Sequence, residues 1–185
     1  MTAQEFKDAY NSKKMYAYTQ DEERCHIGTA PTLDQALHIH GRACVLQVID
    51  ELMMSLVNFT SAKVRLSDDQ RQRLAWVILS QYAGMRITEL ILFVVKAQAG
   101  HFGKFYATID PIDITTALHQ WWGECSQQRN AYKLARLEWE QQRERDQRER
   151  EYEANKTEIR TILLNGQYTF LGYSERKDKG TITIK

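Results

Sequence analysis

The sequence predicts an all-α protein, with a compact helical domain followed by a long charged helical extension and a C-terminal β-hairpin. Only two prolines interrupt its 185 residues, so long helices meet few breaks. Apolar residues make up 43% of the chain, enough for the core of one domain. From position 32 onward they recur at spacings of three, four and seven, which is typical of amphipathic helices.

The predicted organisation has four parts. Residues 1–31 are polar, rich in tyrosine and weakly periodic, and we expect a polar N-terminal arm, with one short helix around Phe6–Tyr18 as an open alternative. The helical core domain covers 32–139, the charged helical extension 140–165, and a hairpin or mobile tail 166–185. The last part contains QYTFLGY and TITIK, two alternating segments separated by SERKDKG, which is typical of a hairpin.

Helix starts are the clearest local signals. Thr32 with Gln35, and Ser67 with Gln70, form capping boxes in which a hydroxyl accepts from a free N–H and a glutamine reaches back. The first box predicts one helix that ends near Phe59. The second predicts a helix that ends at a left-handed glycine, Gly84.

The later helices follow the same logic. Thr88 is the expected cap of a third helix, whose sequence ELILFVVKA is apolar nearly all round, so we expect it to be central and buried. Asp110 caps a fourth helix with Pro111 at its first position, where no N–H is needed. Residues 140–151 contain no apolar side chain, so they form a solvated charged helix or a disordered tract.

Charge and cysteine content exclude several classes of protein. The net charge of +1 does not indicate a globally basic nucleic-acid binder. Three widely spaced cysteines do not suit a secreted disulfide framework. The N-terminus lacks the apolar run of a signal peptide, and the apolar runs LMMSLVNF and LILFVV are too short to span a bilayer. We therefore expect a cytoplasmic protein without membrane association.

The candidate binding site is the loop AGHFGKFYATID together with a lysine just before it. Two glycines would let a ligand approach the backbone, and aromatic rings beside lysine suit stacking on unpaired bases. In the alternative interpretation, the glycines only make the turn and the aromatic rings fill the core. The candidate residues are Lys96, Gly100, His101, Phe102, Gly103, Lys104, Phe105 and Tyr106.

Metal and catalytic sites are not predicted. Cys25-His26 and His38-x-His40-xxx-Cys44 supply ligand types, but no CxxC pair exists and one helix cannot aim both His38 and His40 at the same ion. Glu89 has a sufficient explanation at a helix start. We expect no catalytic residues, no metal and no cofactor, hence a protein that is not an enzyme.

Residues 87–118 resemble a family of uncharacterised small helical proteins carried by phages and conjugative elements of gut bacteria. The resemblance rests on an acidic residue and a phenylalanine in an apolar helix, a G-x-[YF]-G-x-[FY]-Y loop, and an aspartate before a helix. These positions are Glu89, Phe93, Gly100, Phe102, Gly103, Phe105, Tyr106, Asp110, Ile114 and Leu118. Small helical phage helicase loaders are similar only in architecture.

The family has no assigned activity. The residues and the resemblance together lead us to expect a non-enzymatic accessory protein of a mobile element, acting in replication or transfer. Its expected partner is a protein, with single-stranded nucleic acid as another partner open at this point. The first alternative is a structural or scaffolding interaction module with no nucleic-acid role. A second alternative is an enzyme whose site is assembled across several helices.

Overall fold

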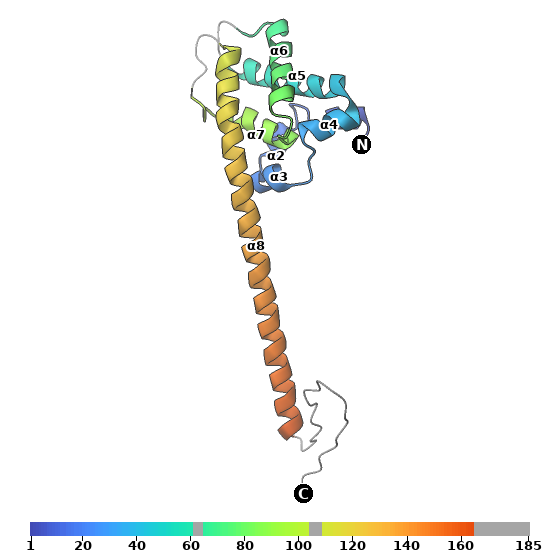
Figure 1. Cartoon of the computed structure of the whole chain (residues 1–185), viewed down its shortest axis with the longest axis vertical. Helices are drawn as coiled ribbons and strands as arrows, with labels where there is room; N and C mark the ends of the chain where they lie inside the picture. Colours follow the sequence, from blue (N-terminus) through green and yellow to red (C-terminus); the bar gives the residue numbers. More distant parts are fainter. Residues whose placement is uncertain (61–64, 104–108, 165–185) are drawn as a thin grey trace. The chain divides into compact units, whose positions relative to one another are not determined.

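The protein is all-α. The computed structural model describes residues 1–60, 65–103 and 109–164, with side chains through residue 157. Within these ranges the elements are helices, and no strand is present beyond one isolated bridge between Thr32 and Arg86 (Figure 1). The helices are α1 (Ala3–Ala9), α2 (Met15–Tyr18), α3 (Glu22–Ile27), α4 (Leu33–His40), α5 (Arg42–Phe59), α6 (Asp68–Gln81), α7 (Ile87–Gln98) and α8 (Pro111–Leu164).

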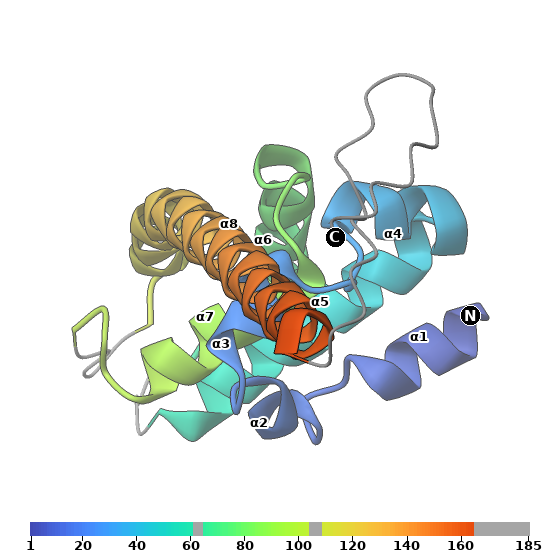
Figure 2. The same cartoon turned by 90° about the horizontal axis from the view of Figure 1, so that it is seen from below.

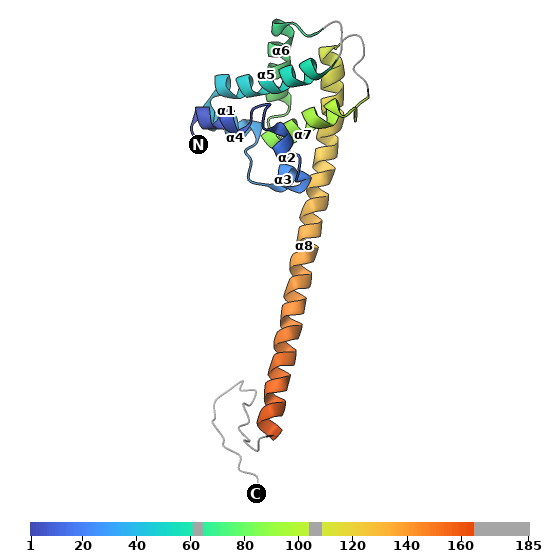
Figure 3. The same ribbon diagram turned by 180° about the vertical axis from the view of Figure 1, so that it is seen from behind.

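The chain divides into two compact units, Met1–Leu134 and Ala135–Lys185. In the first unit, α5 packs against α4, α6 and α7, and α2 and α3 pack against α7 (Figure 2). Helix α1 lies along α5 (Figure 3). The part of α8 that belongs to this unit buries Ile114, Leu118 and Trp121.

Three predicted helix starts, at Thr32, Ser67 and Asp110, are confirmed. Thr32 and Ser67 each accept from the N–H three residues on and receive the reciprocal glutamine bond. The carboxylate of Asp110 accepts from the N–H of Ile112 at 2.8 Å, and α8 begins at Pro111. Helix α7 instead begins one residue before the expected cap Thr88, with Arg86 as N-cap and the carboxylate of Glu89 accepting its N–H at 2.9 Å.

Gly41 divides the helix expected over residues 32–59 into α4 and α5. Its φ of 79° and ψ of 158° are open essentially to glycine alone, so the chain turns there between two helices. Gly84, by contrast, has no positive φ, since α6 already ends at Tyr82. The apolar spacing continues across Gly41, which is why the break is invisible to periodicity.

Residues 1–31 differ from the expected polar arm. They form α1, α2 and α3, and they place Phe6, Met15 and Cys25 in the core with at most 2% of each residue exposed. Short helices carry little periodicity, so their burial follows from packing against α5 and α7. The core domain therefore extends from Met1 to Leu134 in place of 32–139.

Helix α7 is the central helix, as its sequence predicts. Leu90, Ile91, Phe93 and Val94 are all fully buried. The start of α7 is tied to the start of α4 through the backbone: the N–H of Leu33 donates to Met85 at 2.8 Å and the N–H of Ile87 donates to Pro31 at 3.1 Å. Two free helix N-termini thereby complete each other's hydrogen bonds.

In the second unit, α8 continues as a helix to Leu164. Its side chains form exposed pairs four residues apart, such as Arg136–Glu140 and Arg148–Glu144. The predicted hairpin at 166–185 lies outside the described residues. Within the described part of the chain, no helix combines the length and apolarity needed to cross a bilayer.

Candidate functional site

The predicted loop begins where α7 ends, and its glycines serve the turn. Gly100 has a φ of 84° and Gly103 a φ of 91°, both in the region that side-chain-bearing residues avoid. A Cβ built on either glycine would meet nothing within 4 Å. The backbone conformation therefore accounts for both glycines without a ligand.

The first aromatic residue of the loop packs inward. Phe102 is half-buried, with its ring 5.1 Å from Phe93 and 6.2 Å from Trp121. His101 is exposed, and its Nε2 lies 3.3 Å from a carboxylate oxygen of Glu124. In this part of the loop the core interpretation fits better than a stacking platform.

The lysine before the loop already has partners. The Nζ of Lys96 lies 3.0 Å from Glu22 and 5.6 Å from the centre of the Trp121 ring. It is half-buried, so it is not a free cation for phosphate. Lys104, Phe105 and Tyr106 lie outside the described residues.

A second candidate site is a buried polar cluster around Glu89, which we call the Glu89 cluster (Glu89, His26, Arg129 and Cys125). Glu89 is fully buried in the first turn of α7. One carboxylate oxygen lies 3.0 Å from Nδ1 of His26, and Nη1 of Arg129 donates to both oxygens at 2.7 and 2.8 Å. Because a carboxylate only accepts, Nδ1 carries the proton.

Backbone contacts hold the cluster in place. The indole N–H of Trp121 donates to the carbonyl of Glu89 at 2.9 Å, and the hydroxyl of Thr88 donates to the carbonyl of Cys25 at 2.8 Å. The guanidinium of Arg86 donates to the carbonyls of His26 and Ala30. The residues on α3, α7 and α8 are thus fixed by hydrogen bonds as well as by packing.

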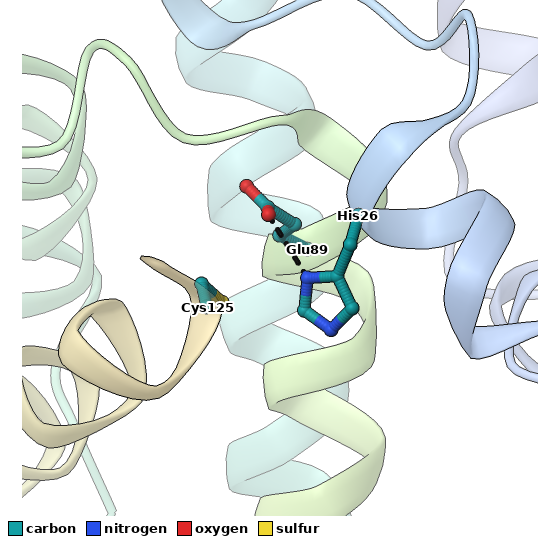
Figure 4. A group of neighbouring side chains, drawn as sticks. All are labelled: His26, Glu89 and Cys125. Carbon is teal, nitrogen blue, oxygen red and sulfur yellow. Dashed lines mark hydrogen bonds and ion pairs between the residues drawn. The ribbon is translucent and has the colours of Figure 1, made fainter. Parts of the chain in front are cut away.

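One atom of the cluster has no partner. Nε2 of His26 is fully buried and forms no hydrogen bond with any residue that the structure describes. The ring is flanked by Trp121 and Tyr132 at 5.7 and 5.9 Å between ring centres. Cys125 approaches from α8, and burial, followed by the charge of Glu89, raises the pKa of its thiol (Figure 4).

The hydrogen bonds and ion pairs of the cluster join helices α3, α7 and α8. Each of His26, Glu89 and Cys125 has a ligand atom within 4.8 Å of the other two, so the same residues could also hold a metal ion.

The sequence did not predict this site, because its members lie far apart in the chain. His26 and Glu89 are separated by 63 positions, and Glu89 and Arg129 by 40. The available signal was a carboxylate within the apolar sequence of α7.

The metal ligands considered in the sequence are not brought together. His38 is exposed beside Asp34, while His40 stacks on Phe6 at 4.5 Å between ring centres. Cys44 is buried in α5 with its sulfur 3.5 Å from the carbonyl of Ala3. Only His26 of that set belongs to the Glu89 cluster.

In a comparison with known proteins, residues 63–145 match the model of a family of unknown function, DUF6633. No curated protein and no solved structure matches the chain. The matched segment contains Glu89, Cys125 and Arg129 but not His26, which comes from α3.

Proposed function

We propose that this protein is a non-enzymatic accessory protein of a mobile element, cytoplasmic, that binds a protein partner through the charged part of α8. The observation that carries the proposal is the exposure of large apolar side chains there. Leu137 is 53% exposed, Trp139 59% and Tyr152 66%. Tryptophan and arginine are the residues that most often dominate binding energy at protein interfaces.

The surroundings of Trp139 suit such an interface. The guanidinium of Arg143 lies 5.3 Å from the centre of the indole ring, so an aromatic surface and a cation are presented together. Exposed carboxylates and guanidinium groups alternate along the same helix. The fitting partner surface is an apolar pocket with a rim of both charges, which favours a protein over the uniformly negative backbone of a nucleic acid.

Three further arguments support the proposal. Lys96 is engaged by Glu22, and Phe102 packs toward Phe93, which weakens the nucleic-acid interpretation of the loop. His26 and Glu89, the best-oriented titratable pair, are fully buried and offer no face to a substrate. The resemblance to proteins of mobile elements, which falls inside the matched segment 63–145, supports a role in replication or transfer.

The test is crosslinking followed by measured affinity. A photoreactive residue at Gln142, one turn beyond Trp139, should capture a protein in cells that carry the parent element, and nuclease should not reduce the yield. With the captured protein purified, Trp139→Ala should weaken binding about 30-fold, the effect of losing roughly 2 kcal/mol. Trp76→Ala, a matched control at an exposed tryptophan of α6 that also has an arginine over its ring, should change the affinity less than threefold.

Three outcomes would contradict the proposal. Crosslinks that disappear with nuclease would assign the partner role to nucleic acid. Crosslinks only to a second copy of the chain would favour the scaffolding alternative. Equal affinities for the wild type and for Trp139→Ala would remove this helix face from the interface.

A further inference from the structure

We infer that His26, Glu89 and Cys125 form a binding site for one divalent transition-metal ion of the zinc class. The three side chains come from α3, α7 and α8, and all are fully buried. Their ligand atoms lie within 4.8 Å of one another. Imidazole nitrogen, carboxylate oxygen and thiolate sulfur are the ligand types that zinc takes in proteins.

The distances between these ligand atoms are close to the distances between ligand atoms around one bound zinc ion. Zinc–ligand bonds of about 2.0–2.3 Å at tetrahedral angles place neighbouring ligand atoms roughly 3.4–3.6 Å apart. Nδ1 of His26 and Oε1 of Glu89 are 3.0 Å apart in the metal-free arrangement. A shift of about 1 Å by the Cys125 side chain would complete three ligands, and a water would take the fourth position.

The second ring nitrogen of His26, Nε2, has no hydrogen-bond partner among the described residues, so no contact at Nε2 opposes a change of tautomer. With the proton on Nδ1, Nε2 keeps a lone pair in the interior without a donor, and buried polar atoms are rarely left so. Coordination through Nδ1 moves the ring proton to Nε2 and brings Nδ1, a carboxylate oxygen of Glu89 and the sulfur of Cys125 onto one ion. Glu89→Gln should therefore weaken metal binding, because the carboxylate is itself a ligand.

Arg129 occupies the position that competes with the ion. Its guanidinium neutralises Glu89 in the metal-free protein, and 20% of its side chain is exposed. It also lies 4.6 Å from the Trp122 ring centre.

Charge balance fixes the proton count. Cysteine binds a metal ion as the thiolate. Binding of a divalent ion therefore forms a metal–thiolate bond and releases the thiol proton of Cys125 to solvent.

The experiment uses the full chain after treatment with a chelator, with Co²⁺ and Zn²⁺ as probes. Co²⁺ should bind at one ion per chain and give a thiolate-to-cobalt charge-transfer band, and Zn²⁺ should displace it. Cys125→Ser should abolish the band and lower the affinity at least tenfold. Cys44→Ser, the matched control at another buried cysteine, should preserve both. Arg129→Met should raise the affinity severalfold, since it removes the competing cation.

X-ray absorption on the wild-type zinc complex makes the outcome independent of whether a variant folds. One sulfur among nitrogen and oxygen ligands supports the site. Three results would show that the Glu89 cluster only pairs buried charges and binds no metal ion. They are the absence of one-to-one binding, a charge-transfer band that persists in Cys125→Ser, and a ligand shell without sulfur.

Discussion

Arg129→Met should destabilise the domain by about 2–3 kcal/mol. The substitution keeps an unbranched side chain and removes the guanidinium that donates to both oxygens of Glu89 and lies over Trp122. Glu89 would remain buried with His26 Nδ1 and the N–H of Arg86 as its partners. Breaking a fully buried ion pair costs about 3–5 kcal/mol, and we expect less because Arg129 is partly open to water, which can solvate the vacated position.

The measurement is urea unfolding followed by circular dichroism and tryptophan fluorescence. Arg136→Met is the matched control, since Arg136 pairs with Glu140 on the exposed surface and its loss should cost under about 0.5 kcal/mol. A double variant with Glu89→Gln should cost less than the sum of the two single changes, because each removes the same interaction. Equal stability losses for Arg129→Met and Arg136→Met would refute the idea that the buried carboxylate depends on its guanidinium partner.

Three further predictions follow from other sites. Phe93→Ala, at a fully buried position, should cost about 3–5 kcal/mol in the same titration, whereas Phe59→Ala, at a 60% exposed position, should cost under about 1 kcal/mol; similar costs would contradict the assigned core. Gly41→Ala should destabilise by about 1–3 kcal/mol because of its positive φ, while Gly123→Ala within α8 should be stabilising by about 0.5–1 kcal/mol; two effects of the same sign would be inconsistent with the break at Gly41. Burial raises the pKa of the Cys25 thiol from 9.0 to about 11, so the folded state retains a proton that the unfolded state releases. Stability should therefore be unaffected by this thiol below pH 9 and should fall by up to about 1.4 kcal/mol per pH unit between pH 9 and 11, and an unchanged slope in Cys25→Ala would contradict it.

The sequence predicts those parts of the fold that depend on near neighbours. The starts of α4, α6 and α8 are capped by Thr32, Ser67 and Asp110, each acting within three residues of itself. The all-round apolar pattern of α7 likewise predicts its central burial. Each of these features depends on residues that are close in the sequence, so the order of residue types is enough to predict it.

Long-range pairing explains what the sequence did not predict. Glu89 at the start of α7 has an adequate local explanation, and its buried state depends on His26 and Arg129, which nothing nearby identifies. Phe6 and Met15 stand in weakly periodic segments whose burial is decided by α5 and α7. Of the predicted loop residues, the described ones, Lys96 and Phe102 among them, turn out to contact the domain, because their partners Glu22 and Phe93 come from other parts of the chain.

The backbone bonds that join the start of α4 to the start of α7 have a consequence for how the chain folds. In the folded domain the N–H of Leu33 donates to the carbonyl of Met85, 52 residues later in the chain, so this bond forms only when the two segments meet. Neither helix therefore acquires its full set of hydrogen bonds early, and closing this long loop should come with the rate-limiting step. Amides at the two N-termini should exchange with deuterium together, in a single cooperative opening of the domain. The segment 63–145, which matches the family model, does not contain Pro31, the partner of Ile87 at the start of its central helix.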